Sequence, residues 1–361
     1  MTPLQQTTPV RFNIARGTTR SGLRPLIAAV LLSTTCGCAL TGAVSRQEPR
    51  EVSPAKAARA SEHISTALQS YQAGDFERAL KEVRRAREFD PHLASAHELE
   101  ALFHADLGDD EGYVAALRTV VREHPKTHHL QRNAGKMLIR AGQHAEGLAA
   151  MRRSIELVPH DTEGALDLAG IHVDLGDVAS AIEVLSESRR HNPLDADLAV
   201  ALARLNETSG DWHAAMSHYT AALEQQPRNT SWRRQRAKCL YRLEDYQTAA
   251  AEFQACLDAD LRCLTTNDRI EFADSCLHIG DYDRAAHLFD DIGTEGDNAR
   301  EIAALRGVCE LRRGNTRAAT RIFQSALQRW PDDTSLSLLL EATRNSSSAI
   351  IPAAGAAPGV N

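Results

Sequence analysis

This sequence lacks the short motifs that carry most enzyme chemistry. Its 361 residues contain no Gly-x-Ser-x-Gly, no phosphate-binding loop, no dinucleotide-binding glycine pattern and no His-Glu-x-x-His. Each of those motifs sets a nucleophile, a phosphate cradle or a pair of metal ligands at a fixed spacing. We therefore expect no enzyme activity, no cofactor and no small-molecule substrate.

The cysteines and histidines also lack the spacings of a metal or redox site. Five cysteines follow residue 38, and none of them forms a Cys-x-x-Cys pair. Four fall within predicted helices, where a thiol serves as compact core packing, and one disulfide among the five is the alternative if the chain is exported. Of fifteen histidines only His128 and His129 are adjacent, and neighbours on a helix do not face one another. We predict no metal site. The five cysteines are Cys239, Cys256, Cys263, Cys276 and Cys309.

Positive charge is scarce outside the first residues of the chain. The formal net charge is −7, and residues 1–38 hold four arginines and no acidic residue, so the remainder is near −11. Nucleic acid demands clustered cations on its partner. We therefore do not expect a nucleic-acid partner.

What the sequence does have is a glycine and a proline that each return every 34 residues. A fixed period between 20 and 50 residues indicates a stacked repeat protein. Such a protein works by presenting a surface, which favours binding over catalysis. The glycines are Gly74, Gly108, Gly142, Gly176 and Gly210, and the prolines are Pro91, Pro125, Pro159, Pro193 and Pro227.

One copy, residues 196–229, shows what each repeat is made of. Apolar residues at helical spacing lead to Gly210, which suits a left-handed backbone at a helix end, and Asp211 can then cap a second helix. Pro227 ends that second helix because proline cannot continue the hydrogen-bond ladder. Five residues after most turns comes an alanine, where two helices must approach closely. Each copy is predicted to be a helix, a tight turn and a second helix.

The stretches "AGDFERAL", "SGDWHAAM" and "IGDYDRAA" resemble the tetratricopeptide repeat (TPR) motif. The resemblance implies an all-α, right-handed α-solenoid in one continuous array. The sixth turn has Glu244 in place of glycine, and two inserted residues in the stretch 260–266 predict a local kink. A helix over 334–344 is expected to cap the last repeat with Leu336, Leu339 and Leu340, leaving Leu338 exposed, and 345–361 to be disordered. The eight repeats are predicted at 60–93, 94–127, 128–161, 162–195, 196–229, 230–265, 266–299 and 300–333.

The first 38 residues have the pattern of an export signal. Arginines precede the apolar run 26–32, which is too short to span a bilayer as a helix. The following "STTCGCALTG" resembles a bacterial lipoprotein signal, which implies lipidation of Cys38, with Cys36 as the alternative. It departs from that family at Thr35, where an aliphatic residue is usual. Ordinary cleavage near Ala43 and an uncleaved anchor are the other interpretations.

If the lipoprotein resemblance holds, residues 39–59 are a flexible tether. The repeats would then be held at a membrane and face the periplasm. A soluble periplasmic or secreted protein is the alternative location.

In TPR arrays the first helix of each repeat lines a concave groove, and residues at i, i+4 and i+8 form one stripe. Two such stripes are cationic here, and they could receive an acidic peptide or a C-terminal carboxylate. They partly resemble carboxylate-clamp TPRs, but the repeat after Lys136 supplies Asp167 where a clamp would have a polar or basic residue. Alternatively, the stripes are solvated helix faces balanced by neighbouring acids. The candidate residues are Arg132, Asn133, Lys136 and Arg140 in repeat three, Arg204 in repeat five, and Arg234, Lys238, Tyr241 and Arg242 in repeat six.

The sequence thus predicts a non-catalytic scaffold for protein–protein interaction, exported and tethered, that holds a protein or peptide partner. A self-assembling structural protein and an accessory subunit of an envelope assembly or export complex are the alternatives.

Overall fold

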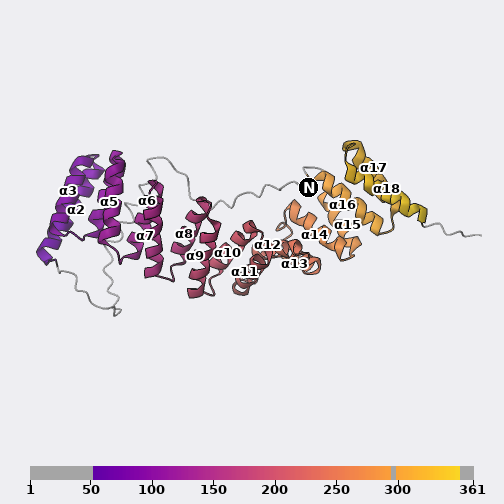
Figure 1. Cartoon of the computed structure of the whole chain (residues 1–361), viewed down its shortest axis with the longest axis horizontal. Coiled ribbons are helices and arrows are strands. Elements are labelled where there is room, and N and C mark those ends of the chain that lie inside the picture. The colour runs from indigo at the N-terminus through magenta and orange to yellow at the C-terminus, as the bar shows by residue number, and fades with distance from the viewer. Residues whose placement is uncertain (1–51, 294–297, 350–361) are drawn as a thin grey trace, which may run out of the picture. The chain divides into compact units, whose positions relative to one another are not determined.

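The computed structural model describes residues 52–293 and 298–349, and all regular structure within them is α-helical (Figure 1). The chain divides into two compact units at the Asn192–Pro193 bond, where the sequence predicts one continuous array. The predicted signal, Cys36, Cys38, Ala43 and the final residues 350–361 lie outside the described residues. The helices of the described chain pair in sequence order, which confirms the predicted all-α fold of helix–turn–helix repeats.

The first unit contains repeats one to four. Its first helices carry even labels and its second helices odd labels, and each first helix packs against the second helix that follows it. Apolar clusters fill the space within and between pairs. The helices are α2 (Pro54–Gln72), α3 (Phe76–Phe89), α4 (Ala94–Leu107), α5 (Asp110–Glu123), α6 (His128–Arg140), α7 (His144–Leu157), α8 (Thr162–Asp174) and α9 (Val178–His191).

The second unit contains repeats five to eight and the terminal helix. Within it the first helices also contact one another directly, α12 with α14, α14 with α16 and α16 with α18, so they form one face. The helices are α10 (Ala196–Ser209), α11 (Trp212–Gln225), α12 (Thr230–Arg242), α13 (Tyr246–Ala259), α14 (Thr266–His278), α15 (Tyr282–Ile292), α16 (Ala299–Arg312), α17 (Thr316–Arg329) and α18 (Thr334–Ala349).

A left-handed turn joins the two helices of each repeat, as the glycine period predicts. At Gly210 φ is +78°, and the N–H of Asp211 donates to the carbonyl of Asn206 at 2.9 Å. The Asp211 carboxylate then accepts from the N–H of Ala214 at 3.0 Å and caps the second helix. The same cap is made by Asp75, Asp109, Asp177, Asp245 and Asp281.

Small residues allow the paired helices to approach closely. The alanines five residues after the turn are fully buried. In repeat three two glycines meet instead: a Cβ on Gly147 would lie 2.6 Å from the carbonyl oxygen of Gly135, which no side chain tolerates. The alanines are Ala79, Ala181, Ala215, Ala249, Ala285 and Ala319.

The two ends of the helical array differ from the prediction. Helix α2 begins at Pro54, so the expected tether is wrong for residues 54–59; proline at the first helical position loses no hydrogen bond there. Helix α18 continues past the predicted end to Ala349, so disorder is wrong for 345–349, because a formed helix extends at one hydrogen bond per residue. Leu336 and Leu340 are buried against repeat eight as expected, and Leu338 is exposed.

The two-residue insertion lies between α13 and α14, where the chain makes a loop. Leu264 in this loop is buried, and Thr265 forms a capping box with Asp268 at the start of α14. The loop therefore accommodates the insertion without breaking the helix pairing. The five cysteines of the described chain are free thiols, and four of them are fully buried in the core.

The sixth turn gives a prediction about stability. Glu244 has φ of +62° and is the one non-glycine residue of the described chain with positive φ. This conformation costs a side-chain-bearing residue about 1–2 kcal/mol. Glu244→Gly should raise the free energy of unfolding by about 0.5–1 kcal/mol, after the greater backbone entropy of glycine is allowed for, as measured by urea denaturation.

The matched reverse change is Gly210→Ala. No atom lies within 4 Å of the added Cβ, so its cost arises from φ alone, and the free energy of unfolding should fall by about 1 kcal/mol. A Glu244→Gly protein no more stable than wild type would contradict this account of the turn.

Buried histidines in the first unit predict an acid-sensitive fold. The rings of His97 and His124 lie 5.2 Å apart, and His97 Nε2 donates to the carbonyl of Pro91 at 2.7 Å. His97 Nδ1 and His124 Nε2 are buried with no hydrogen-bond partner in the described chain. Burial lowers the pKa of both rings, and for His124 the nearby His97 and His92 lower it further. The charges of Arg87, Glu100 and Glu123 also act on this pair.

Because both pKa values are lower in the folded state, the unfolded chain takes up protons first as the pH falls below about 6.5. Urea denaturation should therefore show a free energy of unfolding that is full well above that pH and decreases as the pH falls from about 6.5 to 5.5. Each histidine contributes at most about 1.4 kcal/mol per pH unit. His124→Leu should flatten this dependence, whereas His144→Gln, at an exposed site, should not. Equal slopes in the two variants would show that the buried rings are not the cause.

Candidate functional site

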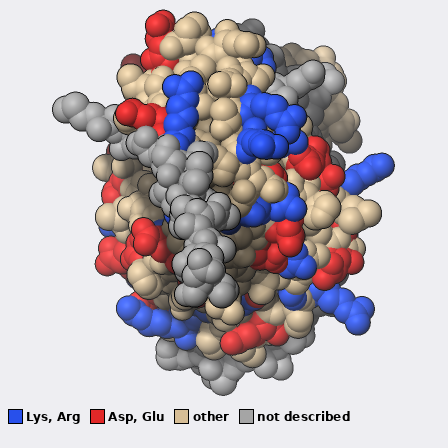
Figure 2. All heavy atoms as spheres, turned by 90° about the vertical axis from the view of Figure 1, so that its right-hand side faces the viewer, with Lys and Arg blue, Asp and Glu red and all other residues tan. Residues whose placement is uncertain are grey.

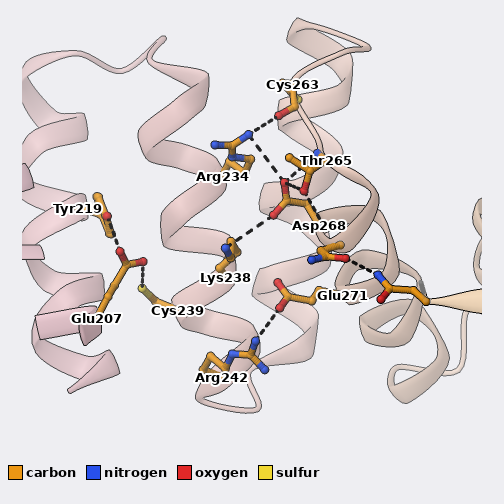
Figure 3. A network of polar contacts seen from close by, with 12 residues as sticks. Glu207, Tyr219, Arg234, Lys238, Cys239, Arg242, Cys263, Thr265, Asp268 and Glu271 are labelled. Carbon is orange, nitrogen blue, oxygen red and sulfur yellow. Dashed lines mark hydrogen bonds and ion pairs between the residues drawn. The ribbon is translucent and has the colours of Figure 1, made fainter. Parts of the chain in front are cut away.

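The candidate site lies on the face of first helices in the second unit, around α12. Successive turns of α12 carry Arg234, Lys238 and Arg242, and all three point toward α14 (Figure 3). The side chains are between a quarter and two fifths exposed. Helical spacing thus places the predicted stripe of repeat six on one face, as expected.

Two carboxylates on α14 lie opposite these cations. Asp268 lies 3.8 Å from Arg234 Nη1 and 4.0 Å from Lys238 Nζ, and Glu271 accepts from Arg242 Nη2 at 2.9 Å. Burial raises the pKa of Glu271, and the charges of Arg242 and Lys238 oppose that effect. The stripe is therefore balanced in part by acids of the next repeat.

The Asp268 carboxylate is already occupied by the capping box. Its Oδ2 accepts from the N–H of Thr265 at 2.8 Å and from the Thr265 hydroxyl at 2.6 Å. Both cations stay beyond hydrogen-bond distance from Asp268. Arg234 Nη1 donates to the carbonyl of Cys263 at 2.9 Å, and its Nε is buried with no partner among the described residues. Arg234 and Lys238 thus share one carboxylate and keep unused donors.

Tyr241 and Arg204 lie beside this stripe but are held differently. The Tyr241 hydroxyl donates to Asp274 at 2.8 Å, and the Arg242 guanidinium lies 5.5 Å from the centre of the Tyr241 ring. Burial raises the pKa of Tyr241, so it stays a neutral donor. Arg204 on α10 is exposed and close enough to Glu207 for their charges to interact.

Glu207 extends the polar network toward α11. It accepts from the Tyr219 hydroxyl at 3.0 Å and from the Cys239 thiol at 3.8 Å (Figure 3). Burial raises the pKa of Glu207, while these hydrogen bonds and the charge of Lys238 lower it. The predicted cations of repeat six are therefore flanked by two carboxylates, Glu207 and Glu271, whose pKa values are raised by burial.

The predicted stripe in repeat three is balanced more completely. Lys136 Nζ lies 2.8 Å from Asp167, and Arg132 reaches Asp161 at 3.3 Å and Glu163 at 3.2 Å. Two cations thus contact three carboxylates, Asp161 at the end of the same repeat and Glu163 and Asp167 in the next, as the solvated-face alternative predicts. Arg140 is exposed, and Asn133 lines a crevice between α4, α5 and α6.

Sequence reasoning found the cations and missed Asp268 and Glu271. A signal was present: an acid follows a cation by about one repeat, at 31 residues for Lys136 and at 29 for Arg242. On the face drawn in Figure 2, basic and acidic side chains are interspersed in the same way.

The described residues hold neither a metal cluster nor a membrane-crossing helix. No three side chains among the histidines, cysteines, aspartates and glutamates of residues 52–293 and 298–349 come together as ligands. In those same residues no helix has both the length and the apolar character needed to cross a membrane.

Solved structures that resemble this chain do so at low sequence identity. The Naa15/Naa10 complex bound to HypK-THB matches with a TM-score of 0.53 and 14% identity, covering 81% of this chain and 46% of that one. YrrB, described as a TPR protein with an unusual peptide-binding site, matches with a TM-score of 0.47 and 16% identity over 54% of this chain and 98% of its own. Pseudomonas aeruginosa pilF matches with a TM-score of 0.37 and 18% identity, covering 62% of this chain and 99% of its own.

Sequence models of the tetratricopeptide repeat match residues 138–205, 200–260 and 271–334, which together exceed half of the chain. They coincide with the paired helices, left-handed turns and aspartate caps described above. Such repeats indicate a scaffold for protein–protein interaction. The chain therefore belongs to the tetratricopeptide repeat family.

Proposed function

We propose that this protein is an exported, membrane-tethered scaffold that binds an acidic segment of a partner protein along the α12 stripe. One observation carries the proposal: Arg234 and Lys238 share Asp268, whose Oδ2 already accepts two hydrogen bonds in the capping box of α14. A carboxylate from a partner can take the unused donors without removing an existing hydrogen bond. The proposed occupant is therefore a polypeptide segment rich in aspartate and glutamate.

The charge of the surroundings favours this occupant at the stripe over other parts of the surface. Away from the four arginines of residues 1–38 the chain is near −11, so an acidic segment is repelled from most of it. At α12 three cations face two carboxylates, and burial raises the pKa of one of these, Glu271. The three cations of the stripe give an acidic segment both attraction and specificity.

The export and the tether rest on the sequence of the first residues. An arginine-rich segment, a short apolar run and a cysteine after a small residue support a lipid-anchored protein facing the periplasm. A scaffold held in this way collects its partner at the membrane surface and needs no catalytic site of its own.

Binding of a fluorescein-labelled Glu-Asp-Glu-Glu-Asp-Glu peptide to the full chain tests the stripe, read as fluorescence anisotropy at low ionic strength. Lys238→Met should weaken binding about fivefold, the effect of losing one partly exposed ion pair of about 1 kcal/mol. Lys136→Met is the matched control, because Lys136 is already paired at 2.8 Å, and its affinity should stay near wild type. The Gln/Asn analogue of the peptide should bind weakly.

If wild type and Lys238→Met bind the peptide with equal affinity and have the same circular dichroism spectrum, the α12 stripe is not the binding site. Capture of envelope proteins on wild type and on Lys238→Glu then extends the test to natural partners. The same set of partners on both would place the binding surface elsewhere.

The anchor is tested by labelling with a radioactive fatty acid in a bacterial host. We expect label on the wild-type chain and on Cys36→Ala, and loss of label from Cys38→Ala, because lipidation requires the thiol. Label that persists on Cys38→Ala but not on Cys36→Ala would assign the lipid to Cys36. Absence of label from all three would argue against the tether.

A further inference from the structure

A crevice with an apolar lining opens between α4, α5 and α6 in the first unit. It is partly open to solvent, and the centre of a water-sized sphere can reach about 30 Å³ within it. Its walls come from two successive repeats, so it lies at the joint between them. The apolar lining is made by Leu99, Leu102, Leu117, Val120, Leu130 and Met137 with two alanines.

Two polar side chains also line this crevice, Glu98 from α4 and Asn133 from α6. Glu98 is half-buried, and burial among apolar neighbours raises its pKa to about 7. Within the described chain no cation and no hydrogen-bond donor is found on its carboxylate, and no charge of the chain contributes to that pKa. Glu98 is thus a half-buried carboxylate without a partner.

Its neighbours on the same helix show how unusual this is. Glu100 is paired with Arg84 and Arg87 from α3. Arg132 follows Glu98 by one repeat and could have faced it from α6, but it is engaged by Asp161 and by Glu163 on α8. Among the described residues that line the crevice there is no lysine or arginine. A half-buried carboxylate costs free energy unless a partner is supplied.

We propose that this crevice binds an aliphatic side chain of a partner polypeptide and that Glu98 pairs with a lysine or arginine next to it. The apolar walls remove the aliphatic group from water, which is the main source of affinity. The carboxylate selects a cation beside that group, and a neighbouring acid would be repelled. The proposal rests on the proposed function only in taking the occupant to be a polypeptide.

The crevice and the α12 stripe therefore select opposite charges. A basic, aliphatic segment fits Glu98, whereas the stripe fits an acidic segment. The two sites lie in different units and use different helices, so each can be tested while the other is intact.

Methionine side chains report directly on the crevice. The chain has four methionines, and of these Met137 lines the crevice while Met216 belongs to the second unit. With ¹³C-methyl methionine in the full chain, the Met137 signal is assigned through Met137→Leu. The probes are three acetylated, amidated peptides: Gly-Ser-Leu-Lys-Ser-Gly, the same peptide with Glu for Lys, and the same peptide with Ser for Leu.

We expect the Leu-Lys peptide to shift the Met137 signal in a saturable way and to leave Met216 unchanged. The Leu-Glu and Ser-Lys peptides should bind at least about fivefold more weakly, because each lacks one of the two contacts. Glu98→Gln keeps the shape of the side chain and should lower the affinity for the Leu-Lys peptide by a similar factor. Glu111→Gln is the matched control, because Glu111 is an exposed glutamate on α5 outside the crevice. This variant should bind the Leu-Lys peptide with the affinity of wild type.

A Met137 signal that none of the peptides moves would overturn the proposal, and so would equal binding of Leu-Lys by wild type and Glu98→Gln. Unchanged Met151 and Met216 signals show that each variant is folded. Failure here leaves binding of the acidic peptide at Lys238 unaffected, so the two proposals fail separately.

Discussion

The left-handed turn with its aspartate cap is the constraint on which the rest of the structure depends. A residue with φ near +80° ends the first helix, and the aspartate after it starts the second within one residue. This fixes the angular register between the two helices, so in six of the eight repeats a fully buried alanine five residues after the turn meets the neighbouring helix. Because the register is fixed, every other position of the 34-residue repeat acquires a constant place on its helix.

That constancy explains how much of the fold could be predicted. The glycine, aspartate and proline of each copy act locally, so residues 196–229 alone were enough to place α10 and α11. Prediction failed at the ends of the array, whereas the sixth turn was placed correctly at Glu244 although its glycine is missing. At Glu244 the hydrogen bond from Asp245 N–H to the Leu240 carbonyl, 3.0 Å long, forms without glycine, so the surrounding repeats impose the turn. The ends of α2 and α18 belong to no repeat and carry no periodic signal.

Of the candidate site, the sequence predicted the cations but not the carboxylates that pair with them. Spacing of four residues on a helix places Arg234, Lys238 and Arg242 on one face, and the sequence shows this directly. Their acids lie slightly less than one period away, because helical side chains point toward the N-terminus and a long cation reaches back over the preceding turn of the next helix. What no spacing reveals is that Asp268 is committed to Thr265. The difference between a satisfied lysine and an available one depends on that capping box.

One position of the repeat shows why pairing, and not charge alone, decides what a TPR surface can bind. Glu98, Arg132 and Arg234 occupy the same register in repeats two, three and six. Arg132 pairs with two carboxylates. Arg234 shares with Lys238 the Asp268 carboxylate, which already accepts hydrogen bonds from Thr265. Glu98 pairs with no cation in the described chain. A charge satisfied within the fold gains little from a ligand, since a new contact only replaces an old one. Binding energy is therefore available where the neighbouring repeat leaves a charge unmatched, and such positions are set by the differences between repeats.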